Sequence, residues 1–285
     1  MRALLTLIAF AVYFAIAPAS DAGWPSSGRA YLPSGGGGAC SQATTFLART
    51  SGLSGTQTSA YTALICGMVT DGTWSVMDGL YVFATNSTTT ANLNLVSTSY
   101  GLIQSGTVSF SANNGYTGDG STGQFVSGFI PATAGGNWSL NSASIGACVL
   151  SSRANSFSYP SIGGFAHYDY SFILPGYAGA SGTQFALNGD TQTLASSNSQ
   201  GAWTYSKTSS SQGYTSINGS TTSVTPAVAI ITNSQLYVLS NGNGSYSIDQ
   251  IAYVFFGGGL TPTQITAVYN RLHTYLSTVG AGSGC

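Results

Sequence analysis

The sequence predicts a mainly β protein, a sandwich or barrel of antiparallel strands with helices before it and one helix after it. From about residue 86 to residue 258, short β-branched and aromatic runs alternate with Gly, Asn, Ser and Thr at hairpin-like intervals. Before this region, four apolar side chains fall on one face of a helix: Tyr61, Leu64, Ile65 and Met68. After it, "LTPTQITAVYNRLHTYLSTVG" repeats apolar residues at helical spacing.

The first 22 residues predict an export signal. Arg2 supplies a positive start, an apolar run follows, and small residues suit cleavage after Ala22, or after Ala19 as a second choice. The run is short for a membrane span, so we expect none in the mature chain, with an uncleaved anchor as the alternative. Residues 23–39, rich in Gly and Pro, predict an arm or linker. The predicted location is secreted, periplasmic or at the cell surface.

Residues 40–85 predict a small helical subdomain. A short helix is expected around residues 44–50, and a longer one begins at a cap supplied by Ser54, Thr56 or Thr58. Asp71-Gly72 then ends the longer helix with a turn.

Residues 86–285 predict the β-sandwich and its closing helix. Thr261 is a good N-cap, Pro262 fits the first helical position, and Gln264 completes a capping box. Gly280 is expected to end this helix, whose apolar stripe should lie on the sheet.

Four cysteines fit an exported chain with two disulfides, for which three connectivities exist. We favour Cys40 with Cys285, because the two ends of a domain often lie close together. Cys66 and Cys148 would then form the second bond, or remain as buried free thiols. No cysteine or histidine spacing indicates a zinc site.

Charge is scarce: the chain has 6 basic and 7 acidic residues and a net charge of −1, and it contains no Glu. A nucleic-acid partner is excluded, because such proteins need a basic surface. Ser, Thr, Asn and Gln must solvate the surface, which suits an extracellular or particle-bound protein. A net charge near zero also favours self-association.

Three stretches carry a resemblance to a known family: "GYTGDGSTGQFVSGF", "TQFALNGDTQT" and "GSYSIDQIAYVFFGGGLTPTQITAVYNRL". Their order resembles the laminin-G-like branch of the concanavalin A-like lectin/glucanase superfamily, over roughly Ser109 to Ser277. The resemblance implies an opening strand pair that turns through Asp-Gly, a later two-residue hairpin, and a closing strand followed by a helix. It also implies a jelly-roll sandwich of two antiparallel sheets, commonly used to bind glycans or proteins. The arrangement is similar, too, to uncharacterised proteins encoded in bacterial genomes and prophages.

Catalysis is not expected. The glucanases of that superfamily carry paired Glu residues, which this chain lacks, and its Asp residues are scattered one per segment. His167 and Asp169 would share one face of a strand, where they could act as a general base in a hydrolase. The favoured interpretation is an exposed strand face that alternates with Phe165, Tyr168 and Tyr170.

Sugar rings stack on aromatic faces, and four aromatic residues in Gly-flanked, loop-like sequence are the candidate ligand-binding residues: Trp138, Trp203, Tyr205 and Tyr214. Most aromatic residues of a sandwich fill its core instead, so burial is the alternative for each of them.

A weak calcium site is the candidate metal site. Asp119 could bind the ion together with Asn113, Asn114 and Ser121. The favoured interpretation is a turn at Asp119-Gly120 within an opening hairpin, with Phe125 and Phe129 both facing the core.

These observations predict a secreted, non-catalytic protein that binds a glycan or cell-surface polymer, or acts as an adhesive surface component. The alternative is a structural subunit, prophage-derived or surface-assembled, whose partner is itself or a neighbouring particle protein.

Overall fold

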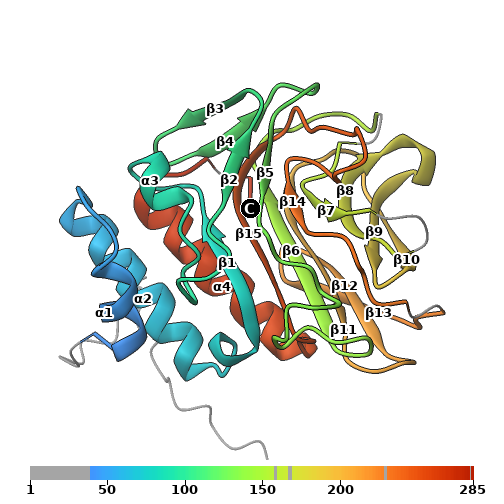
Figure 1. Cartoon of the computed structure of the whole chain (residues 1–285), viewed down its shortest axis with the longest axis horizontal. Helices are drawn as coiled ribbons and strands as arrows, with labels where there is room; N and C mark the ends of the chain where they lie inside the picture. Colours follow the sequence, from blue (N-terminus) through green and yellow to red (C-terminus); the bar gives the residue numbers. More distant parts are fainter. Residues whose placement is uncertain (1–38, 157–158, 166–168, 228–229, 283) are drawn as a thin grey trace, which may run out of the picture. The chain divides into compact units, whose positions relative to one another are not determined.

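The computed structural model describes residues 39–156, 159–165, 169–227, 230–282 and 284–285. The predicted export signal and all of the predicted arm except residue 39 lie outside the described residues, as does His167. From residue 38 to the last residue, the chain forms one compact unit. Its two antiparallel sheets pack face to face as a sandwich, and this confirms the predicted fold class (Figure 1).

The first sheet contains eight of the described strands. Their order is β13 (Ser220–Val224), β12 (Gly213–Ile217), β11 (Gly201–Lys207), β6 (Ala143–Val149), β15 (Gln250–Gly257), β4 (Gly115–Gly118) and β3 (Val108–Ser111). β1 (Met77–Val82) is the eighth strand. The first two residues of β15 pair with β4, and the rest of the same edge of β15 pairs with β1.

The second sheet contains the seven remaining described strands. Their order is β10 (Asp190–Ala195), β9 (Gly182–Leu187), β8 (Ser171–Tyr177), β7 (Ile162–Gly164), β14 (Tyr237–Val238), β5 (Gln124–Val126) and β2 (Ile103–Ser105). Between the sheets lies a core rich in aromatic rings. Phe125 and Phe129 are fully buried in it, as predicted.

Helices cover the outer face of the first sheet. They are α1 (Ser41–Leu47), α2 (Gly55–Thr70) and α4 (Pro262–Val279), and the 3-10 turn η1 (Trp74–Val76) packs beside them. The four-residue α3 (Thr88–Ala91) follows β1, and a second 3-10 turn, η2 (Ala178–Ala180), connects β8 to β9 in the second sheet. α2 packs against α4, and apolar side chains of both helices share a second core with residues of β1 and β15 (Figure 1).

The predicted ends of the two long helices are confirmed, whereas the short helix expected around residues 44–50 lies at Ser41–Leu47. The Ser54 side chain accepts a hydrogen bond from the backbone N–H of Gln57 and completes a capping box at the start of α2. Thr261 and Gln264 form the same arrangement at the start of α4. α4 ends at Gly280, whose φ of 75° favours a residue without a side chain.

The helical segment ends earlier than the sequence predicts. Met77–Val82 belongs to the first sheet, where it pairs with β15, so residue 85 does not mark a boundary between a helical and a β region. A short apolar run fits a buried strand as well as a helix. The strand that decides between them follows about 170 residues later in the sequence.

The Asp119 turn is not a hairpin. β4 belongs to the first sheet and β5 to the second, so residues 119–123 connect the two sheets, and the prediction of an opening hairpin is wrong. The later hairpin is confirmed. Asn188 and Gly189 join β9 to β10 as a two-residue turn, with φ of 53° and 80°.

The favoured cysteine pairing is wrong, and so is the free-thiol alternative. Cys40 bonds to Cys66, which joins the start of α1 to α2, and Cys148 bonds to Cys285, which joins the chain end to β6. The positions of the helices explain which cysteines form each disulfide. The segment after α4 returns to β6, whereas Cys40 stays beside the helices that follow it.

Burial of tyrosine hydroxyls makes stability depend on alkaline pH. Burial raises the pKa of Tyr61 to about 12, and it also raises the pKa of five others: Tyr81, Tyr116, Tyr205, Tyr253 and Tyr275. In the unfolded chain tyrosine ionises near its ordinary pKa of about 10. The folded state therefore keeps protons that the unfolded state loses above that pH.

We expect the contribution of these tyrosines to the free energy of unfolding to be constant below a pH of about 10 and to decrease steadily above it. Urea denaturation at a series of pH values measures this change. Absorption by tyrosinate reports the ionisation directly. If all tyrosines of the folded protein ionised at the ordinary pKa, this explanation would fail.

Candidate functional site

The predicted aromatic residues do not form a binding surface. Trp138 and Trp203 are 4% and 1% exposed, and their indole N–H groups donate to Asn188 Oδ1 and to the Ser199 carbonyl oxygen. Tyr205 is fully buried and donates its hydroxyl to Asp190. Their prediction as ligand-contacting residues is therefore wrong, because a buried ring has no free face for a sugar. All three instead lie in the core between the sheets.

Tyr214, the fourth predicted residue, lies on β12. It is half-buried, and its ring packs against the core beneath the helices. None of the three buried residues lies beside it to form a shared platform.

The Asp119 carboxylate is occupied by its own turn. Oδ1 accepts from the backbone N–H groups of Ser121, Thr122 and Gly123 at 3.0, 2.8 and 2.7 Å, and the hydroxyls of Ser121 and Thr122 donate to Oδ2. The Thr122 hydroxyl, followed by these backbone donors, holds the pKa of the carboxyl well below its usual range.

The predicted calcium ligands are not assembled around Asp119. Asn113 and Asn114 follow β3 at the opposite end of β4, so the turn supplies one carboxylate and no asparagine oxygen from this pair. Among the described residues, no three His, Cys or Asp side chains are grouped closely enough to share a metal ion.

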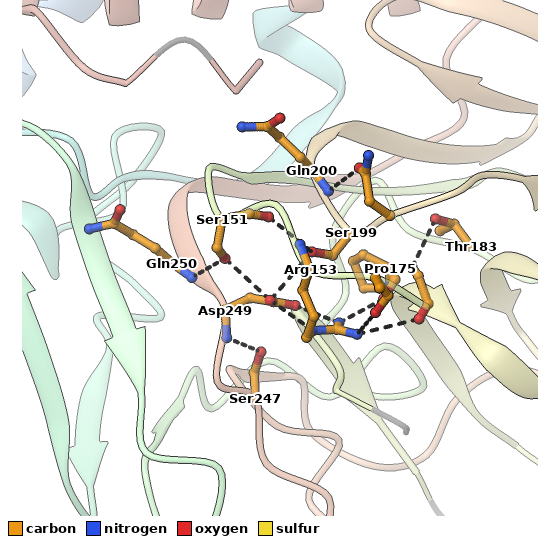
Figure 2. Close-up of polar contacts among 12 residues, drawn as sticks. Ser151, Arg153, Pro175, Thr183, Ser199, Gln200, Ser247, Asp249 and Gln250 are labelled. Atoms are coloured by element: carbon orange, nitrogen blue, oxygen red, sulfur yellow. Dashed lines mark hydrogen bonds and ion pairs between the residues drawn. The ribbon is translucent and has the colours of Figure 1, made fainter. Parts of the chain in front are cut away.

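A charged cluster around Arg153 and Asp249 links the two sheets of the sandwich. Arg153 Nη2 lies 2.9 Å from Asp249 Oδ2, and the guanidinium also donates to the carbonyl oxygens of Pro175 and Gly176 on β8 (Figure 2). Hydroxyl groups of Ser151 and Ser199 donate to Oδ1 of the same carboxylate. The cluster therefore ties the ends of β6 and β15 in the first sheet to β8 in the second.

A second polar cluster lies between the sheets. Asp190 is buried, and it accepts hydrogen bonds from the Tyr205 hydroxyl, from Gln192 Nε2 at 2.9 Å and from the Ala227 N–H at 2.7 Å. Lys207 is also fully buried, and its charge interacts with that of Asp190. Since Asp190 has partners on both oxygens, this cluster is also structural.

The predicted catalytic pair cannot be assembled from the described residues. His167 lies outside them, and Asp169 Oδ2 accepts the backbone N–H of Asn233 at 3.0 Å. Of the two residues, the structure therefore describes only Asp169, and its carboxylate bonds to the backbone.

A cleft on the helical side remains as the candidate site. It encloses about 170 Å³ between α1, η1 and the loop after α3. Its lining is one aromatic ring, one cation, one amide and several hydroxyl and aliphatic groups: Ser41, Gln42, Thr45, Arg49, Trp74, Leu95, Val96, Ser97 and Thr98. We call it the Trp74 cleft.

The walls of the Trp74 cleft are held in place. The Cys40–Cys66 disulfide joins the start of α1 to α2. The buried Asn94 side chain accepts from the Leu80 N–H and donates to the Asp78 carbonyl, which anchors the loop of residues 94–98 to β1. Arg49 donates to carbonyl oxygens of the same loop. These contacts fix the loop of residues 94–98 and α1, which form two walls of the cleft.

The cleft combines an aromatic ring with polar side chains. The ring of Trp74 is half-buried, while the Gln42 amide and the hydroxyls of Thr45 and Thr98 can donate and accept hydrogen bonds. The sequence alone does not predict this cleft, and Trp74 falls within the segment expected to be helical. No local signal marks it, because its walls come from three segments that only folding brings together.

The comparisons with known proteins establish the fold. No family model and no curated protein matches the sequence. Domain 4 of AbnA, a GH43 extracellular arabinanase of Geobacillus stearothermophilus solved with arabinotriose, is 13% identical with a TM-score of 0.51. The match covers 68% of this chain and 98% of that domain.

Trypanosoma rangeli sialidase with the inhibitor DANA is 12% identical, with a TM-score of 0.46, and the match covers 68% of this chain and 32% of the sialidase chain.

Among the described residues, no helix is long and apolar enough to cross a membrane. The chain therefore has a β-sandwich fold, which it shares with domain 4 of AbnA.

Proposed function

We propose that this protein is exported and binds a glycan in the Trp74 cleft without chemically changing it. The observation that carries the proposal is the composition of the cleft: one half-buried tryptophan ring, bordered by amide, hydroxyl and guanidinium groups, on walls that other contacts hold in place. Sites of this kind stack one face of a sugar and bind its hydroxyls at the edge.

Two further observations support the proposal. Domain 4 of AbnA, which shares the fold, was solved with arabinotriose, so the fold can serve sugar binding. The two disulfides support export, because such bonds persist in oxidising compartments. The proposal of a non-enzyme rests on the carboxylates of Asp190 and Asp249, which structural partners occupy.

The proposal predicts that Trp74→Ala weakens glycan binding by about 30-fold, the effect of losing a contact worth about 2 kcal/mol. A glycan array with the purified protein identifies the ligand, and calorimetry then measures its Kd. Trp74→Phe keeps a ring in the cleft and should retain much of the affinity.

Tyr214→Ala is the matched control, since it removes another half-buried ring, on β12 rather than in the cleft. Its affinity should equal that of the unchanged protein. A blank array, or a Trp74→Ala protein that is folded by circular dichroism and binds as before, would contradict the proposal.

A further inference from the structure

We infer that the Trp74 cleft selects acidic glycans, with Arg49 binding a carboxylate of the sugar. The inference rests on the proposed function, and it specifies the class of ligand. It follows from the charge of Arg49, from the way its guanidinium is held, and from what else lines the cleft.

Arg49 carries a charge that no carboxylate offsets within the described residues. The two ion pairs found there join Arg153 to Asp249 and Arg271 to Asp71. Burial lowers the pKa of Arg49, and no acidic group acts in the opposite direction. A partly buried cation without a counter-ion is a favourable partner for an arriving anion.

The guanidinium is held in one orientation by the loop. Nη1 donates to the carbonyl of Ser97 at 2.8 Å, and Nη2 donates to the carbonyls of Asn94 and Leu95 at 2.8 and 3.1 Å. The guanidinium carbon also lies 5.4 Å from the centre of the Phe46 ring. The cation is thus positioned before binding, so little side-chain entropy is lost when a ligand is bound.

Hydrogen-bonding capacity remains after these contacts. A guanidinium has five N–H groups, and the loop carbonyls use three of them. Nε has no hydrogen-bond partner among the described residues but is itself buried, so the unused N–H of Nη1 is the donor that remains for a ligand. A carboxylate accepts such donors in charge-assisted hydrogen bonds, which are about twice as strong as neutral ones.

The rest of the lining favours an acidic sugar over a simple anion. No Asp or Glu lines the cleft, so nothing there repels a carboxylate. Trp74 and the surrounding hydroxyls would be of little use to a small inorganic anion, but they match a sugar ring. A ring that carries a carboxylate uses both halves of the site at once.

The test uses the whole exported protein and matched pairs of glycans. Each probe is an oligosaccharide that contains uronic or sialic acid, and its partner is the same oligosaccharide with the carboxylate reduced to an alcohol. Calorimetry should show at least a tenfold weaker Kd for the reduced partner of the bound probe. Affinity should also fall with added salt and as the pH drops through the pKa of the sugar carboxylate.

Two variants examine Arg49 itself. Arg49→Gln should remove the preference for the acidic probe, whereas Arg49→Lys, which keeps the charge, should retain part of it. Thermal unfolding of each variant shows whether the loop of residues 94–98 has been disturbed. If Arg49→Gln weakened both members of a pair equally, Arg49 would serve only to hold the loop, and the inference would be overturned.

The two proposals fail differently. Equal affinity for both members of a pair, combined with a loss of binding in Trp74→Ala, would overturn the acidic-sugar inference and leave glycan binding intact. Failure to bind any acidic or neutral glycan would overturn both.

Discussion

Replacing Cys148 and Cys285 together by serine is expected to lower the free energy of unfolding by about 3–5 kcal/mol. The bond spans 137 residues, and it attaches the segment after α4 to the central strand β6. Without it, the unfolded chain gains the entropy of that long loop. Urea denaturation of the double variant under oxidising conditions measures the loss.

The other disulfide provides the matched comparison. Cys40 and Cys66 are only 26 residues apart, so loop entropy predicts that their removal costs about 1.5 kcal/mol less. Replacing this pair leaves β6 untouched. Equal losses for the two pairs would show that loop length does not govern their contributions.

Asp249→Ala is expected to cost about 3–5 kcal/mol of stability, the cost of leaving a buried charge without its partner. The Asp249 side chain is 1% exposed and that of Arg153 is 13% exposed. After the substitution, the guanidinium would remain beside the carbonyls of β8 with no carboxylate to offset its charge. Two-state denaturation curves measure the effect.

Two controls separate this loss from the mere removal of a side chain. The double variant Arg153→Met with Asp249→Leu removes both charges, and it should recover much of the stability. Asp71→Ala breaks the more exposed pair with Arg271 and should cost no more than about 1 kcal/mol. If Asp249→Ala cost no more than Asp71→Ala, the Arg153 cluster would not be what ties the two sheets together.

Local features were predictable because neighbouring residues cause them. The capping boxes at Ser54 and Thr261 depend on a side chain three residues further along, and the Asn188-Gly189 turn depends on two adjacent residues. For the same reason, the turn expected at Asp119-Gly120 is present, and the Asp119 carboxylate bonds within it. The error was to pair the strands on either side of that turn as a hairpin. The sheet that each strand joins depends on partner strands far away in the sequence.

Exposure could not be read from local composition. Trp138 and Trp203 lie near glycines, which suggested loops, yet Trp203 lies within β11, and the rings of both fill the core between the sheets. Trp74 drew no prediction of its own within the expected helical segment, yet it lines a cleft. The face that a ring presents to water depends on what packs against it, and those neighbours come from remote segments.

By itself, the sequence determined the mainly β class, the helix ends, the tight turns and the presence of enough cysteines for two disulfides. The tertiary structure decided which cysteines pair, that Met77–Val82 is a strand, and that Arg49 and Trp74 line one cleft. The physical reason is the range of the forces involved. Capping and turn formation act over a few residues, whereas pairing and burial depend on surfaces that meet only when the chain has folded.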